Sequence, residues 1–232
     1  MKICAISDTH THHNKVEVPE CDILIHAGDA THRGGTKDTA KFVNWLAAQD
    51  QAKHKVFIAG NHDFMPQTDP GQFYNLLDEL DINYLEDSYV ELEGLNIYGT
   101  PWTPYFCDWA FNGLEERGID GYMYQGGPGP MNPSNKYQHL KDVYAKIPDD
   151  TDVLICHGPP AGIGISTTEE GTEVGSFELL HRALDLKNLK LGICGHIHEG
   201  RGHSYINEAY WYNVSTCNRA YKAVNPVTII EL

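Results

Sequence analysis

The chain has 232 residues, 41% of them hydrophobic, which is enough to bury a sizeable core and fits one domain over residues 1–232. No apolar run approaches the roughly 18 residues that a membrane-spanning helix requires, so we expect no membrane segment. The 17 basic residues are outnumbered by 32 acidic ones, and a net charge of −15 repels extended nucleic acid. A small molecule is therefore the expected partner.

Apolar runs and amphipathic stretches alternate along the chain and predict a mixed α/β fold. Runs typical of buried strands lie at 3–6, 23–25, 56–59, 153–156 and 191–194. Helical spacing of apolar residues lies at 36–49, 72–80, 137–146 and 176–186, with Asp69 and Pro70 opening the second of these. The runs 89–92 and 95–98 are separated by Glu93 and Gly94 and predict a β-hairpin.

Side chains that can bind a metal follow each of the five apolar runs. They are Asp8 and His10, Asp29, Asn61, His157, and His196 with His198. Because ligands collect outside the carboxyl ends of strands in an open α/β sheet, we expect these side chains to converge. Two divalent cations need roughly seven or eight protein donors, one of them a bridging carboxylate, and this set supplies that number.

Three glycines, Gly28, Gly60 and Gly195, each stand immediately before a candidate ligand. At such a position the chain turns sharply off a strand and approaches a metal or anion closely, which a Cβ would obstruct. The glycines therefore support a metal-binding interpretation of the residues that follow them.

The fragments stand in the order D-x-H, G-D, G-N-H-D/E, H and G-H-x-H, which resembles the calcineurin-like metallophosphoesterases over residues 8 to 198. Further segments resemble the metallophosphoesterase-domain-containing subgroup, which includes proteins similar to small cyclic-nucleotide phosphodiesterases. These segments are 7–10, 100–102, 108–112, 157–160, 195–200 and 213–217. The resemblance implies a four-layer αββα sandwich of two mixed β-sheets flanked by helices.

The resemblance also implies a ligand set. One metal would take Asp8, His10, Asp29 and His198, and the other would take Asp29, Asn61, His157 and His196. Asp29 would bridge the two, because its two oxygens can bind separate cations. Oxygen and imidazole donors without thiolate suit Mn²⁺, Fe or Zn²⁺, and the residues do not choose among these metals.

The mechanism implied by the resemblance is attack on phosphorus by a hydroxide that bridges the two metals, whose charge lowers the pKa of the water. His62 would stabilise the transition-state oxygens or protonate the leaving oxygen. Asp63 is expected to orient and charge the imidazole of His62. These two residues are the predicted catalytic groups.

Each of these residues taken singly has a simpler explanation. Asp and Asn commonly close turns after strands, and a lone histidine is more often satisfied by backbone hydrogen bonds. A His-x-His after the first strand, His10 with His12, also opens amidohydrolase and polymerase-and-histidinol-phosphatase barrels. The predicted hairpin does not match the eightfold βα alternation of a barrel, so we favour the sandwich. His12 and His13 are expected in the cleft or on an exposed loop.

The six cysteines form no C-x-x-C pair, and the residues after Met1 do not resemble a secretory signal. We therefore expect a reducing, cytoplasmic compartment. Cys156 and Cys194 neighbour candidate ligands, but both end apolar runs and are expected to be core residues.

Residues 112–135 include a Gly/Pro run at 126–130 and predict a long loop, either a substrate lid or a solvated insertion. Aromatic residues precede it and offer faces for a nucleobase, or else belong to the core. They are Trp102, Tyr105, Phe106, Trp109 and Phe111.

The sequence predicts a binuclear-metal-dependent phosphodiesterase that hydrolyses small phosphodiesters such as cyclic nucleotides. The alternatives are a phosphomonoesterase or protein phosphatase, a nuclease, and a nucleotide-binding regulatory protein with slow turnover. Asn213 and Ser215 are expected behind the ligands, whereas Glu199, Arg201 and His203 receive no role. The oligomeric state does not follow from the sequence.

Overall fold

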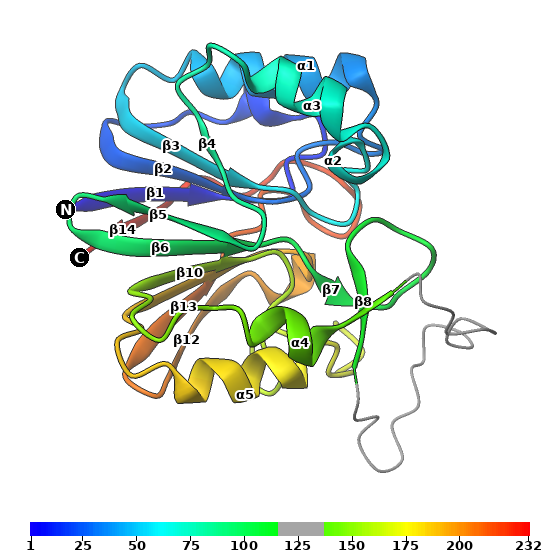
Figure 1. Cartoon of the computed structure of the whole chain (residues 1–232), viewed down its shortest axis with the longest axis vertical. Helices are drawn as coiled ribbons and strands as arrows, with labels where there is room; N and C mark the ends of the chain where they lie inside the picture. Colours follow the sequence, from blue (N-terminus) through cyan, green and yellow to red (C-terminus); the bar gives the residue numbers. More distant parts are fainter. Residues whose placement is uncertain (116–136) are drawn as a thin grey trace.

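The computed structural model describes residues 1–115 and 137–232, which form two large β-sheets packed face to face (Figure 1). Helices cover the outer face of each sheet, so the layers follow the order helix, sheet, sheet, helix. The predicted αββα sandwich is confirmed. The barrel alternative is wrong, because both large sheets are open and end in edge strands.

The first sheet has the strand order β14-β1-β2-β3-β4. Its strands are β1 (Lys2–Ile6), β2 (Cys21–Ala27), β3 (Ala52–Ile58), β4 (Asn83–Tyr84) and β14 (Thr228–Glu231). Strands β1 to β4 run parallel, and β14 pairs antiparallel with β1. Helices α1 (Thr36–Ala47) and α3 (Pro70–Leu77) cover its outer face, and the short α2 (Met65–Thr68) precedes α3.

The second sheet has the strand order β12-β13-β11-β10-β6-β5. Its strands are β5 (Ser88–Leu92), β6 (Leu95–Thr100), β10 (Val153–Cys156), β11 (Leu191–Cys194), β12 (Gly202–Ile206) and β13 (Ala209–Asn213). The four inner strands are parallel, and each edge strand is the antiparallel arm of a hairpin, which confirms the predicted hairpin of β5 and β6. Helices α4 (Leu140–Tyr144) and α5 (Phe177–Asp185) cover this sheet.

A small parallel sheet of β7 (Thr103–Pro104), β8 (Asn112–Leu114) and β9 (Gln138–His139) lies beside the second sheet. Strand β8 occupies the start of the segment predicted as a loop over 112–135, because it pairs with both neighbours. The rest of that predicted lid lies outside the described residues.

The inner strands are apolar on both faces because each face packs against another layer. In β2, Ile23 and Ile25 belong to the same core cluster as Ile155 and Ile193 of the second sheet, whereas Leu24 belongs to the cluster beneath α1. Side chains of a strand alternate between its faces, so a continuous apolar run is what a strand with two covered faces requires. This explains why the predicted strands could be found from apolar runs alone.

The four predicted helices are present but shorter than their apolar patterns. Asp69 caps α3, because its Oδ1 accepts a hydrogen bond of 3.2 Å from the Gln72 N–H. Ser176 caps α5 in the same way through the N–H of Leu179, at 3.1 Å. The helix predicted over 137–146 is reduced to α4 because β9 takes the residues before it.

Substituting Gly99 tests the closeness of the two sheets. An alanine Cβ there would lie 2.4 Å from Leu85 Cβ and 2.7 Å from Ile58 Cγ2. We expect Gly99→Ala to lower the free energy of unfolding in urea by about 1–3 kcal/mol, the usual effect of overpacking. The matched control is Gly71→Ala in α3, where the added Cβ meets nothing within 4 Å. It should raise the free energy of unfolding by up to about 1 kcal/mol, and equal effects of the two changes would contradict the packing argument.

Candidate metal centre

The carboxyl ends of β1, β2, β3, β10 and β11 bring the seven predicted donor residues to one edge of the sandwich. Two groups of side chains place their ligand atoms within 4.8 Å of one another: Asp8, His10 and His198 form the first, and Asp29, His157 and His196 form the second. His10 Nε2 lies 3.8 Å from Asp29 Oδ2, so the two groups adjoin. Asn61 joins the second group through a distance of 2.9 Å between its Oδ1 and His157 Nε2.

Acceptor atoms face one another within the first group. His10 Nδ1 donates to the Thr31 carbonyl at 3.1 Å, and His198 Nδ1 donates to the Asn218 carbonyl at 2.9 Å. In the neutral form that binds a metal, each ring therefore carries its lone pair on Nε2, and these two Nε2 atoms lie 3.3 Å apart. His198 Nε2 is also 3.4 Å from Asp8 Oδ1. A cation among these atoms would remove their mutual repulsion.

The second group repeats this arrangement. His157 Nδ1 donates to the Ala27 carbonyl at 2.9 Å, which leaves the lone pair of Nε2 pointing toward other acceptors. His157 Nε2 lies 3.3 Å from Asp29 Oδ2. Asn61 is fully buried, and its Nδ2 has no hydrogen-bond partner among the described residues. Oxygen and imidazole donors facing inward in two adjoining groups suit a pair of divalent cations such as Mn²⁺, Fe or Zn²⁺.

The two buried carboxylates are held in their charged form. Burial lowers the pKa of His157 and His198, but the nearby carboxylates of Asp29 and Asp8 outweigh it and raise both values to about 9, so without a metal these rings are protonated. Burial raises the pKa of Asp8, but hydrogen bonding to His198 and the charges of His198 and His157 outweigh burial, and the net pKa lies below its usual range. For Asp29, the charges of His157 and His10 likewise outweigh burial, so its pKa also lies well below the usual range. Ionised carboxylates are the form that binds metal.

Hydrogen-bond donors surround Asp8 on the side away from the imidazoles. The hydroxyl of Ser7 donates to Asp8 Oδ2, and the His196 N–H lies 3.0 Å from both carboxylate oxygens. Ser215 Oγ lies 3.0 Å from Asp8 Oδ2 and 2.7 Å from Asn213 Oδ1, so its single proton serves one of them at a time. Asn213 and Ser215 thus stand behind the ligands, as the sequence predicted.

The backbone at the site is strained and tightly packed. Asp8, His10, Asp29 and His196 adopt positive φ angles of 50°, 40°, 55° and 65°. Such angles are uncommon for residues with a Cβ and tend to gather at functional sites. The predicted close approach at the glycines is present, since a Cβ on Gly60 would lie 2.3 Å from Asp29 Oδ1.

His62 lies beside the second group through its backbone and side chain. Its N–H donates to Asp29 Oδ1 at 2.8 Å, and its ring Nδ1 donates to the His32 carbonyl at 2.9 Å. The imidazole packs edge-on against His10, with 5.0 Å between the ring centroids, and 4.5 Å from the ring of Trp109. A half-buried imidazole at this place can reach a molecule bound at the donor groups.

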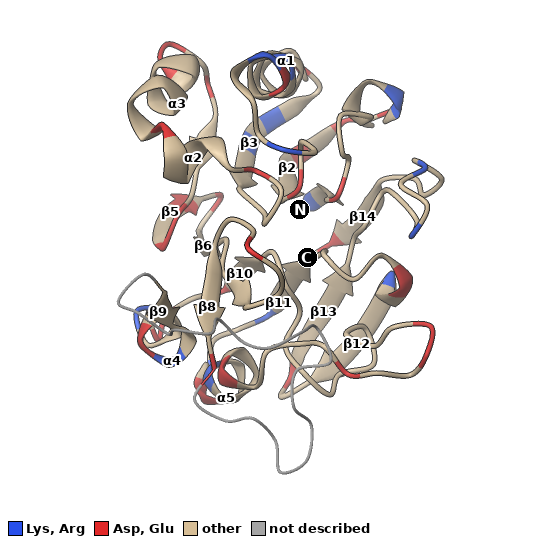
Figure 2. Ribbon diagram, turned by 90° about the vertical axis from the view of Figure 1, so that its right-hand side faces the viewer, with Lys and Arg blue, Asp and Glu red and all other residues tan. Residues whose placement is uncertain are grey.

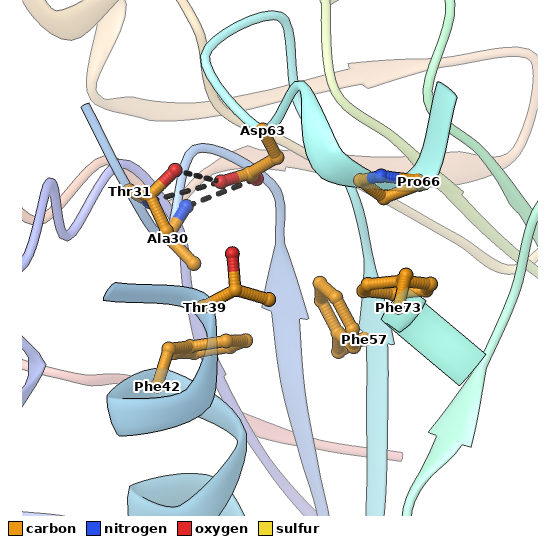
Figure 3. A pocket seen from close by; sticks show the side chains of 8 residues that line it. All are labelled: Ala30, Thr31, Thr39, Phe42, Phe57, Asp63, Pro66 and Phe73. Carbon is orange, nitrogen blue, oxygen red and sulfur yellow. Dashed lines mark hydrogen bonds between the residues drawn. The ribbon is translucent and has the colours of Figure 1, made fainter. Parts of the chain in front are cut away.

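The role predicted for Asp63 is wrong, because its carboxylate binds backbone and not the imidazole of His62. Asp63 Oδ2 accepts from the N–H groups of Ala30 at 3.1 Å and Gly60 at 3.0 Å. Asp63 Oδ1 accepts from the N–H and hydroxyl of Thr31, at 2.9 and 2.8 Å (Figure 3). Burial and the charge of Asp29 outweigh these bonds and raise its pKa to about 6. Asp63 ties together the loops that follow β2 and β3.

A small cavity beneath Asp63 is lined mostly by apolar side chains, among them Phe42, Phe57 and Phe73 (Figure 3). Its volume of about 10 Å³ is at the lower limit for one water molecule. The cavity is therefore a packing gap and not a ligand site.

The structure also shows the positions of His13 and of the aromatic residues that precede the predicted loop. His13 is buried against Phe42 and Trp45, so both of its predicted positions, cleft and exposed loop, are wrong. Trp102 and Phe111 belong to the core, whereas Trp109 lies at the site.

The three residues without a predicted role lie near the C-terminal segment. Arg201 donates to the carbonyls of Ser215 and Pro226, at 2.9 and 2.8 Å, and so anchors that segment. Glu199 lies 3.7 Å from Arg219, and His203 packs against a neighbouring strand. Cys156 and Cys194 are fully buried core residues, as expected.

No sequence pattern indicated Tyr221, whose ring packs edge-on against His10 with 4.7 Å between the centroids. It follows no strand and belongs to no metal-binding pattern, and only its nearness to the subgroup segment 213–217 could have drawn attention to it.

Removing metal should destabilise the protein, because an ion that binds only the folded state stabilises that state. A ligand at 100 times its Kd stabilises by about 2.7 kcal/mol, so we expect EDTA to lower Tm by about 5–10 °C and Mn²⁺ to restore it. His198→Ala should reduce this response, whereas His203→Ala, which changes a histidine outside the donor groups, should retain it. A Tm that is indifferent to EDTA and Mn²⁺ would contradict the metal-binding interpretation.

Replacing Asp63 should mainly lower the stability of the fold and not act directly on turnover. Asp63→Asn loses the charge and one of the two acceptor oxygens that hold the N–H groups of Ala30, Thr31 and Gly60. We expect a lower free energy of unfolding by about 1.5–3 kcal/mol, the scale of a hydrogen bond to a charged group, measured in urea. Unchanged stability together with lost turnover would restore Asp63 as a partner in catalysis.

Comparison with known proteins supports this interpretation of the site. Residues 1–200 match the family model described as "Calcineurin-like phosphoesterase". The whole chain is 32% identical over 252 residues to "Metallophosphoesterase domain-containing protein 1" of Homo sapiens and of Mus musculus, and it spans 71% of each. A 5'-nucleotidase precursor from Thermus thermophilus overlaps 85% of this chain and 42% of its own, with a TM-score of 0.39 and 14% identity, too low to add to the argument.

Members of the matched family typically bind two divalent metals, for which the two donor groups offer ligands. The chain therefore belongs to the calcineurin-like phosphoesterase family, within the subgroup of metallophosphoesterase domain-containing protein 1, and is a metal-dependent phosphoester hydrolase.

Proposed function

We propose that this hydrolase is a phosphodiesterase acting on small phosphodiesters such as cyclic nucleotides. The observation that carries the proposal is that the two donor groups adjoin each other with His62 beside them, while no Lys or Arg of the described residues forms an ion pair with Asp8 or Asp29. A phosphomonoester carries more negative charge than a diester, and its extra charge would need further cationic partners. The site therefore suits the less charged ester.

The charge around the site supports a small substrate. Figure 2 views the molecule from the side toward which β1 points, and its Lys and Arg positions are scattered among acidic ones. Along the ribbon of the described residues, these positions do not follow one another in a row, whereas a nuclease needs a basic track along the phosphate backbone. A nuclease is for this reason the weaker proposal.

The side chains of the site would have separate roles in the hydrolysis of a phosphodiester. When bound, two divalent ions lower the pKa of water and neutralise charge on phosphoryl oxygens. Asp8, Asp29 and the imidazoles would hold those ions. His62 has its Nδ1 engaged with the His32 carbonyl, so it can donate a proton to a leaving oxygen only from Nε2 and only as the imidazolium.

We also propose a cytoplasmic location for this protein. All six cysteines are free thiols, and five of them are buried, which fits a reducing compartment such as the cytoplasm. No helix within the described residues has the length and apolarity to cross a bilayer.

A panel of esters with Mn²⁺ tests the function. We expect kcat/KM for bis-p-nitrophenyl phosphate and for cyclic nucleotides to exceed that for p-nitrophenyl phosphate by about tenfold or more, a difference of about 1.4 kcal/mol, and no cleavage of single-stranded DNA. A preference for the monoester would favour a phosphomonoesterase or protein phosphatase. Failure to hydrolyse any ester by metal-loaded protein would favour the nucleotide-binding regulatory protein.

Loss of the His62 imidazole should affect turnover and leave metal binding intact. We expect His62→Ala to lower kcat by about 10²-fold or more, within the range for general acid catalysis, with metal content unchanged by elemental analysis. His203→Ala is the matched control, since its ring lies outside the donor groups and packs against Tyr212. Equal kcat in His62→Ala and the unaltered protein would remove this residue from the mechanism.

A further inference from the structure

The ring of Tyr221 lies among the histidines of the metal centre. Its centroid is 4.7 Å from that of His10, 5.4 Å from His198, 5.7 Å from His32 and 6.3 Å from His62. Two of these four are donor residues, and His62 is the proposed acid. A molecule bound at the donor groups would therefore meet Tyr221.

The loop that carries Tyr221 is tied to the metal centre by hydrogen bonds. The Tyr221 N–H donates at 2.8 Å to the Asn218 carbonyl, which also accepts from the ligand His198 at 2.9 Å. Asn218 Oδ1 accepts from the N–H groups of Ala220 and Lys222, at 3.0 and 3.1 Å. The loop and the ligand thus share one carbonyl, which fixes the place of the ring relative to the donors.

Tyr221 adopts a strained backbone conformation although it is not needed to fill the core. Its φ is +55°, which is unusual for a bulky residue, and its side chain is 40% exposed. No hydrogen bond to its hydroxyl is formed by the residues that the structure describes. A partly exposed ring with a free hydroxyl, held in place by a strained loop, is suited to contact a ligand.

A second aromatic side chain borders the site at His62. Trp109 packs on the His62 ring with 4.5 Å between the centroids, and the exposed Phe106 packs on Trp109 at 5.5 Å. The Ala110 N–H donates to the Asn61 carbonyl at 3.1 Å, so this loop is also fixed relative to a donor residue. His62 is therefore in ring contact with two aromatic side chains from distant parts of the chain.

We propose that Tyr221 is a specificity-determining residue that contacts the nucleoside part of a substrate whose phosphate lies at the donor groups. Aromatic rings stack on bases of any sequence, and the Tyr221 hydroxyl can donate to a sugar or base oxygen. This inference rests on the proposed function and narrows it to phosphodiesters that carry a nucleoside. Trp109 forms a second aromatic wall of the same space.

The test compares binding of AMP and of inorganic phosphate to Mn²⁺-loaded protein by isothermal titration calorimetry. We expect Tyr221→Ala to weaken AMP about tenfold, the scale of losing one stacked base, and to change phosphate binding less than about twofold. Tyr221→Phe, which keeps the ring, should retain most of the AMP affinity. Tyr205→Ala is the matched control, because Tyr205 is 57% exposed and packs on Tyr210.

Three results would overturn the inference. The first is equal weakening of AMP binding and phosphate binding in Tyr221→Ala, which would mean that the loop only shapes the metal centre. The second is unchanged AMP affinity in Tyr221→Ala, and the third is no AMP binding by the unaltered protein. The two proposals fail separately. Diester hydrolysis with AMP affinity indifferent to Tyr221 would remove the inference alone, whereas Tyr221-dependent AMP binding without diester hydrolysis would remove the proposed phosphodiesterase and leave the nucleoside contact standing.

Discussion

The structure depends on a concentration of electron-pair donors that would repel one another without a positive charge between them. His10 Nε2 and His198 Nε2 face each other at 3.3 Å, and His157 Nε2 faces Asp29 Oδ2 at 3.3 Å. Backbone carbonyls hold the opposite ring nitrogens and so fix which atom carries the lone pair. Without a metal, protons on the imidazoles of His157 and His198 supply this charge, and two bound cations would replace them.

The sandwich supplies the rigidity that such an arrangement needs. Five parallel strands, buried on both faces, end at the same edge and deliver the donors on short loops. Asp63 ties the loops after β2 and β3 through four hydrogen bonds. Ser7 and Ser215 join the two sheets at this edge and contact the carboxylate of Asp8. These three residues therefore fix the positions of the candidate ligands and also stabilise the fold.

The side chains at the edge of the metal centre are of a different chemical kind from the donor side chains at its base. The base of the centre consists of the donor atoms of the two groups, whereas Tyr221 and Trp109 are aromatic rings that both lie against His62. Metal-bound phosphate chemistry is common to many substrates, so selectivity has to come from groups beside the phosphate. Aromatic rings at the edge suit a flat organic ester group such as a nucleoside.

The strand positions, the seven candidate donors and the family could all be predicted from the sequence, because continuous apolar runs mark strands covered on both faces and each run is followed by its candidate ligands. The contacts between side chains, in contrast, depend on how the two sheets and their loops pack together. Asp63 is adjacent to His62 in the chain, yet its carboxylate accepts from the N–H groups of Ala30 and Thr31 in the loop after β2, and the His62 ring contacts the His32 carbonyl instead. Tyr221 reaches the site through a loop whose path depends on hydrogen bonds to Asn218 and His198. Such contacts join residues far apart along the chain, and no local pattern encodes them.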